Sequence, residues 1–86
     1  MKTPVVVEII LREFPATAGA LAAEAHLRDE LGLDSMDIVR LQIALEDRLN
    51  FRFDPSRHDL DSVFTTVGAI NRFLADHNLL EDKGHV

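Results

Sequence analysis

Residues 31–49 read LGLDSMDIVRLQIALEDRL, and they carry the strongest structural signal in the chain. Asp34 is a residue type favoured at a helix N-cap, and Asp37 adds negative charge in the first turn, which the helix dipole favours. On a wheel with 3.6 residues per turn, one stripe of the segment is wholly apolar. That stripe consists of Ile38, Leu41, Leu45 and Leu49. The stretch predicts an amphipathic helix that starts at Asp34 or Ser35 and ends at about Asn50.

The opposite side of this expected helix carries two further apolar residues, Met36 and Ile43. A small bundle buries only one stripe of such a helix, so we expect this pair at the surface, ringed by Arg40, Glu46 and Asp47. An exposed apolar pair with a charged rim is typical of a contact surface. Isolated apolar residues are also normal on protein surfaces, so the pattern alone leaves both interpretations open.

A helix is also expected near the N-terminus, where Thr3 suits an N-cap and Pro4 suits the first helical position. Glu8 and Arg12 are four residues apart and can pair on the wet face. Pro15 ends the segment. The expected inward face consists of Val7, Ile10, Leu11 and Phe14. The β-branched run also suits a strand, but no second strand is available to pair with it.

Two connections separate the remaining elements. Residues 15–33 are expected to form a long connection with a helical turn, anchored by Leu21, Leu27, Leu31 and Leu33. Residues 51–59 are polar and contain Pro55, which predicts a loop.

Two helices are expected after this loop. Asp59 or Asp61 caps a short helix over residues 60–64, and Thr65 or Thr66 caps a last helix that ends at about Asn78. The inward face of the last helix consists of Val67, Ile70, Phe73 and Leu74. The pattern predicts an all-α fold, a small four-helix bundle with three main helices and a short third one. We expect one domain over residues 1–86, with a frayed tail at 81–86.

Composition excludes several classes of function. The 86 residues include nine Lys and Arg, fifteen Asp and Glu, and a net charge of −6. This balance argues against nucleic acid or an anionic membrane surface as partner. No apolar run reaches the ~20 residues of a membrane span. Glu8 and Arg12 interrupt the pattern of a signal peptide. The absence of cysteine excludes disulfides and thiolate chemistry, and suits a reducing cytoplasm.

Catalytic and metal sites are not indicated. The four histidines, His26, His58, His77 and His85, lack metal-ligand spacing. Asp59 and Asp61 fit helix capping better than a cation site, and Ser35 with His58 lacks the turn of a hydrolase nucleophile. We therefore expect no metal and no catalytic residue. Ser35 begins a helix, where an attached phosphate is electrostatically favoured, although capping alone would also explain a serine there.

The sequence resembles the acyl carrier protein family. The resemblance rests on the run Leu31, Gly32, Leu33, Asp34, Ser35, Met36 and Asp37, on Ala44-Leu45-Glu46, and on FTTVGAINRFL over residues 64–74. Length, acidity and the order of the helices also match, so the similarity covers nearly the whole chain.

The resemblance implies that Ser35 carries a 4′-phosphopantetheine arm, installed from coenzyme A by a phosphopantetheinyl transferase. The terminal thiol of the arm would hold acyl groups as thioesters. The protein would be a carrier, not an enzyme. Its partners would be the transferase and enzymes that load, condense or transfer acyl groups. We expect a monomer in the cytoplasm that contacts neither nucleic acid nor the membrane interior.

The resemblance also implies a partner surface on the central helix. Its residues here are Asp34, Met36, Asp37, Arg40, Ile43, Glu46 and Asp47. Arg40 stands where the family usually has an acid, Arg48 dilutes the negative charge, and the connection from 49 to 65 is longer than usual. These departures suggest a specialised member in fatty acid, polyketide or lipid biosynthesis. We expect Arg40→Glu to improve turnover with general fatty acid synthesis enzymes.

Two alternatives stay open. The protein could carry amino acids, as peptidyl or D-alanyl carriers do, although the acidity of the central helix favours acyl cargo. It could also be an unmodified helical adaptor that binds through Met36 and Ile43. Modification of Ser35 distinguishes a carrier from an adaptor.

Overall fold

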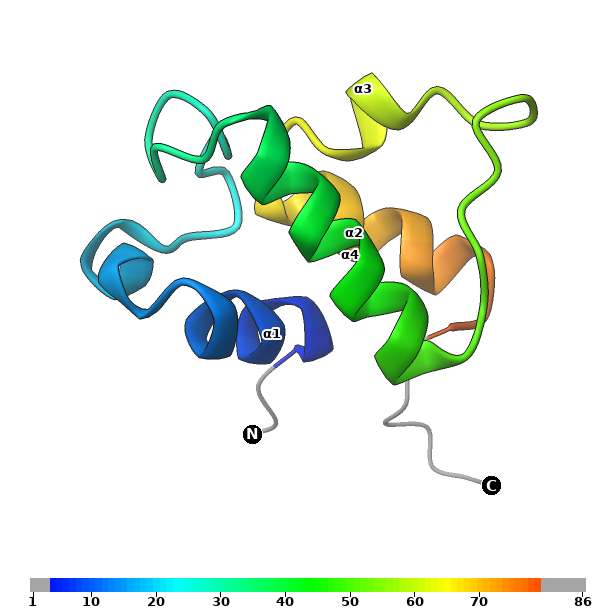
Figure 1. Ribbon diagram of the computed structural model, residues 1–86, viewed down its shortest axis with the longest axis horizontal. Coiled ribbons are helices and arrows are strands. Elements are labelled where there is room, and N and C mark those ends of the chain that lie inside the picture. Colours follow the sequence, from blue (N-terminus) through cyan, green and yellow to red (C-terminus); the bar gives the residue numbers. More distant parts are fainter. Residues whose placement is uncertain (1–3, 80–86) are drawn as a thin grey trace.

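The computed structural model describes residues 4–79, which form five helical elements (Figure 1). These are α1 (Val5–Glu13), the 3₁₀ helix η1 (Pro15–Ala20), α2 (Ser35–Leu49), α3 (Leu60–Val63) and α4 (Val67–Asp76). No β-strand occurs within 4–79, so the predicted all-α fold with a short third helix is confirmed. None of the helices in this range has the length and hydropathy needed to cross a bilayer. The expectations for Thr3, His85 and the tail at 81–86 lie outside the described residues.

The ends of α1 follow from its two prolines. The helix begins at Val5, one residue later than expected, with Pro4 at the N-cap position. It ends at Glu13, and Phe14 leaves the helical region with φ −135° and ψ 67°. A residue before proline is driven out of the α region, so Pro15 ends α1 as predicted and opens η1 instead.

The predicted inward face of α1 was only partly right: Ile10 is buried as expected, and Val7 and Phe14 pack half-buried against the core. The buried residues are Val5, Val6, Ile9 and Ile10. Leu11 keeps 37% of its surface exposed, and Val7 is only half-buried. The reason is that α1 packs against both α2 and α4, while η1 covers another side. An almost continuous apolar run offers several possible stripes, and the neighbouring helices select one of them.

The predicted pairing of Glu8 with Arg12 was also wrong. Glu8 Oε1 instead lies 3.2 Å from Arg48 Nη2 on α2, and Arg12 Nε lies 3.6 Å from Glu13 Oε2. The Glu8–Arg48 pair therefore connects α1 and α2 across the surface.

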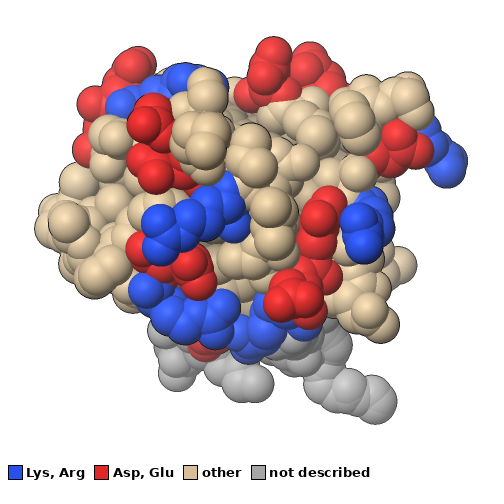
Figure 2. All heavy atoms as spheres, in the orientation of Figure 1, with Lys and Arg blue, Asp and Glu red and all other residues tan. Residues whose placement is uncertain are grey.

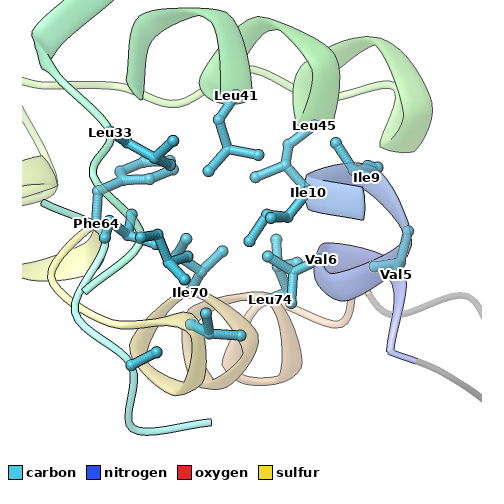
Figure 3. Packing of buried hydrophobic residues seen from close by; sticks show 14 of the residues in the cluster. Val5, Val6, Ile9, Ile10, Leu33, Leu41, Leu45, Phe64, Ile70 and Leu74 are labelled. Atoms are coloured by element: carbon cyan, nitrogen blue, oxygen red, sulfur yellow. The ribbon is translucent and has the colours of Figure 1, made fainter. Parts of the chain in front are cut away.

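The core lies where α1, α2 and α4 meet. Figure 3 shows side chains from the three helices pointing toward one another, joined by Leu33 and Phe64. In α2, Leu41 and Leu45 are fully buried, while Ile38 and Leu49 pack half-buried against the cluster. This arrangement confirms the predicted apolar stripe.

The connection between η1 and α2 is tied to the start of α4. The Leu27 N–H donates to the Thr65 carbonyl at 3.0 Å, and the Gly68 N–H donates to the Ala23 carbonyl at 2.6 Å. A Cβ atom at Gly68 would lie 2.9 Å from that carbonyl oxygen, so this close approach requires glycine. As predicted, the connection is held by leucines: Leu27, Leu31 and Leu33 are buried, and Leu21 is half-buried.

Residues 51–59 form the predicted loop, but its first part is more buried than expected of a polar segment. Phe53 is buried, and its ring lies 4.6 Å from Phe51 and 5.1 Å from Phe64 between centroids. The Phe53 N–H also donates to Glu46 Oε2 at 2.9 Å. The first part of the loop is thus attached to both the core and α2.

The last two helices begin at expected residues, but only α4 has a side chain that caps its backbone. Asp59 occupies the N-cap position of α3, where its carboxylate accepts from Ser62 Oγ at 3.0 Å. Thr66, not Thr65, caps α4 by accepting from the Ala69 N–H at 3.0 Å. The C-cap of α4 is His77, one residue before the expected Asn78. Its inward face is as predicted: Val67, Ile70 and Leu74 are buried, and Phe73 is half-buried.

Candidate functional site

The first turn of α2 is held by a reciprocal capping box. Asp34 Oδ1 accepts from the Asp37 N–H at 2.9 Å, and Asp37 Oδ2 accepts from the Asp34 N–H at 3.2 Å. A glutamate or glutamine usually occupies the N3 position of this motif. Here the shorter side chain of Asp37 takes that position. Both acids were predicted to face a partner. The structure also gives them the task of fixing the backbone on either side of Ser35.

Ser35 is the first residue of α2 and lies exposed at the surface. Its Oγ accepts a hydrogen bond from Arg28 Nη2 at 3.1 Å. An accessible hydroxyl, the positive end of a helix dipole and a nearby guanidinium together fit a covalently attached phosphate group. Sequence reasoning missed Arg28, because it lies seven residues away in a connection without a regular period.

A groove of about 560 Å³ extends from Ser35 between α2 and the region of α3. Its lining is mixed, with Ile38, Val39 and Gln42 from α2 opposite Leu60, Asp61 and Phe64.

The predicted exposed apolar pair is present on α2. Met36 keeps 77% of its surface exposed and Ile43 keeps 59%. Val39, at 50% exposure, lies between them on the same face and was missed. Its position three residues after Met36 and four before Ile43 was the available signal.

Arg40 is not a free charge on this face. Its Nε lies 3.3 Å from Glu13 Oε1, and its guanidinium carbon lies 5.1 Å from the centroid of the Phe14 ring. These contacts turn the side chain toward the end of α1. Glu46 also contacts another part of the chain: it is half-buried and accepts from the Phe53 N–H, whereas Asp47 is exposed.

Between the end of α1 and α2 lies a second groove, of about 740 Å³. It is lined by Met36, Val39 and Ile43 together with Arg12, Glu13, Asp37, Arg40, Ala44, Asp47 and Arg48. Figure 2 shows positive groups lying among the acidic ones on the face that bears α2. The predicted charged rim is therefore part of a surface of mixed charge, which also includes Arg12 and Arg48.

Comparisons with known proteins agree with this arrangement. A family model described as a phosphopantetheine attachment site matches residues 4–74. The chain is similar to an acyl carrier protein of Saccharopolyspora erythraea, with 33% identity over 69 residues, which are 80% of this chain and 70% of that protein. It is equally similar to an acyl carrier protein of Clostridium perfringens, with 33% identity over 70 residues, which are 81% and 88% of the two chains.

The matched segment includes α1, α2, α3 and most of α4, so it covers the fold and the exposed serine together. This chain therefore belongs to the family of phosphopantetheine-bearing carrier proteins, of the acyl carrier type, which hold cargo and do not catalyse a reaction.

Proposed function

We propose that Ser35 carries the 4′-phosphopantetheine arm and that the protein delivers acyl groups, held as thioesters on that arm, to partner enzymes. The observation that carries this proposal is the exposed hydroxyl of Ser35 at the first position of α2. The helix dipole and the Arg28 guanidinium favour a phosphodiester there.

In the loading step, the Ser35 hydroxyl attacks the phosphorus of coenzyme A that bears pantetheine. The new bond joins that phosphorus to Ser35 Oγ, and the pyrophosphate bond breaks. Adenosine 3′,5′-bisphosphate leaves, and the hydroxyl proton passes to a base on the phosphopantetheinyl transferase. The arm supplies a thiol for acyl transfer, and this chain adds no competing cysteine.

The partner surface we propose is the exposed face of α2. Met36, Val39 and Ile43 form its apolar centre. Asp34, Asp37 and Asp47 add negative charge at its edge, and Arg40 and Glu46 border it while contacting other parts of the chain. Charges at the rim of a surface steer the encounter and contribute to specificity more than to affinity, which suits brief contacts with several enzymes.

For the pathway, we propose a specialised monomeric carrier in cytoplasmic fatty acid, polyketide or lipid biosynthesis. The mixed charge of the α2 face supports this choice. Arg12, Arg40 and Arg48 all line the groove beside α2, so an enzyme that recognises only a strongly acidic helix would meet positive groups as well.

The test is the intact mass of the protein after incubation with coenzyme A and a broad-specificity phosphopantetheinyl transferase. We expect a gain of one phosphopantetheinyl group. Ser35→Ala should abolish the gain, while Ser56→Ala and Ser62→Ala, the matched controls at the other two serines, should retain it.

A gain that survives Ser35→Ala would place the arm elsewhere and contradict the proposal. If folded protein gains no mass, protein purified from its own organism is measured next. An unmodified Ser35 there would favour the adaptor instead.

A further inference from the structure

Arg28 Nη2 donates a hydrogen bond to Ser35 Oγ, the proposed attachment oxygen, at 3.1 Å. We propose that Arg28 binds the phosphodiester of the loaded arm and holds the root of the arm against the first turn of α2. This inference rests on the proposed function. It makes Arg28 a positioning residue for the arm.

The backbone around Arg28 is well placed for this role. Leu27, its neighbour, is fully buried, and the Leu33 N–H donates to the Leu27 carbonyl at 2.9 Å. Glu30 Oε1 accepts from the His26 N–H at 2.7 Å. These contacts fix the connection on both sides of Arg28. The side chain therefore needs to order only its own rotamers to reach Ser35.

The charge of Arg28 is available for a phosphate. The salt bridges found within residues 4–79 use Arg12, Arg40 and Arg48, each with a glutamate. Arg28 takes part in none of them, and within the described residues its side chain donates to the neutral Ser35 hydroxyl. A guanidinium presents several N–H donors in a plane that matches phosphate oxygens.

The surroundings of the phosphate make such a counter-charge useful. A phosphodiester on Ser35 adds a negative charge next to the capping carboxylates of Asp34 and Asp37. Asp29 and Asp61 also line the groove beside Ser35. Like charges at this range repel, and the helix dipole offsets only part of the repulsion. Arg28 supplies positive charge where the phosphate joins the chain.

The experiment uses ³¹P NMR of the loaded protein, with the same loaded protein unfolded in urea as the reference for an unbound phosphodiester. Wild-type protein, Arg28→Ala, Arg28→Lys and Arg52→Ala are compared after loading has been checked by mass. Arg52 is the matched control, because it is an exposed arginine beside the far end of α2. We expect Arg28→Ala to move the phosphorus chemical shift toward that of the unfolded reference. Arg28→Lys should fall between, and Arg52→Ala should match the wild type.

Salt provides a test that needs no substitution. At about 1 M salt the Debye length falls to about 3 Å, so screening should move the phosphorus signal of the folded wild-type protein toward that of the unfolded reference. This readout also serves if Arg28→Ala disturbs the fold. Identical phosphorus signals in wild type and Arg28→Ala, with no salt response, would overturn the inference. If the wild-type protein never gains the arm, it is the proposed function that fails.

Discussion

At the scale of single residues, short polar side chains determine how Ser35 is presented. The capping box of Asp34 and Asp37 is closed by two hydrogen bonds, of 2.9 and 3.2 Å. Gly32, at φ +72°, lets the chain turn between Leu31 and Leu33 so that both leucines face the core. The serine that follows needs no buried contact of its own. It is exposed because its neighbours on both sides are anchored.

A similar local motif gives a prediction for the loop after α2. Ser56 Oγ and the Ser56 N–H both donate to Asp54 Oδ1, at 2.7 and 3.0 Å, and these bonds lower the pKa of Asp54 below its ordinary value of 3.8. Because the pKa is lowered, the bonds stabilise the folded state fully at pH values above the ordinary pKa. This contribution is lost as the pH falls through the lower pKa of the folded state. We expect Ser56→Ala to raise the pKa of Asp54 toward 3.8, as measured by an NMR titration of its carboxyl carbon.

Ser62→Ala is the control for this titration, because Ser62 binds Asp59 and not Asp54. An unchanged pKa in Ser56→Ala would contradict the assignment of the cause to the serine hydroxyl.

At the scale of elements, ion pairs on the surface connect α1 to α2. Arg48 contacts Glu8 near one end of the interface, and Arg40 contacts Glu13 near the other. Arg40 stands where the family usually has an acid, on the expected partner surface. The structure adds a second role, because the side chain also spans the gap between two helices.

This second role changes what Arg40→Glu should do. The new carboxylate would face Glu13 and repel it. We therefore expect the free energy of unfolding to fall, whether or not turnover with partner enzymes improves. Arg40→Gln, which removes the pair without adding repulsion, should cost only about 0–1 kcal/mol, because the pair is partly exposed. Arg40→Glu should cost more. Urea denaturation of both variants measures the difference.

The charge-swapped variant Arg40→Glu with Glu13→Arg is the control, since it restores opposite charges at the same two positions. It should recover most of the stability lost in Arg40→Glu. Equal stability of Arg40→Glu and Arg40→Gln would mean that the charge at position 40 does not interact measurably with the Glu13 carboxylate.

At the scale of the whole molecule, α2 divides into a structural face and an exposed face. Leu41 and Leu45 point into the core shared with α1 and α4, while Met36, Val39 and Ile43 point to solvent. A chain of this size has a small core and a correspondingly thin margin of stability. The exposed apolar residues are the centre of the partner surface proposed above.

Leu45→Ala and Ile43→Ala should separate the two faces. Leu45→Ala removes a fully buried side chain and should lower the free energy of unfolding by about 2–5 kcal/mol. Ile43→Ala should change it by only about 0.5 kcal/mol, because the residue is exposed. The same variant should reduce kcat/KM for acyl transfer by about tenfold if Ile43 is a central contact of a partner enzyme.

The measurements are urea denaturation and acyl transfer from the loaded protein. An unchanged transfer rate in Ile43→Ala, and equally in Met36→Ala, would argue against the α2 face as the partner surface.

Much of this molecule follows from local sequence. The bounds of α2, its buried stripe, the stop at Pro15 and the leucine anchors of the long connection were all predicted. Each depends on interactions within one turn or on a regular period. The serine at the start of α2 was singled out differently: its position alone also fits a capping residue, and the resemblance of residues 31–37 to the acyl carrier family pointed to it as the attachment site.

Tertiary structure decided what a period cannot encode. The run VVVEIIL allows more than one buried stripe, and only its packing against α2 and α4 selected Val6, Ile9 and Ile10. The burial of Phe53 depends on rings brought from elsewhere in the chain. Arg28 meets Ser35, and Arg40 meets Glu13, across irregular connections. Sequence spacing specifies which residues share a face, whereas the partners of a side chain depend on how separate elements come together in space.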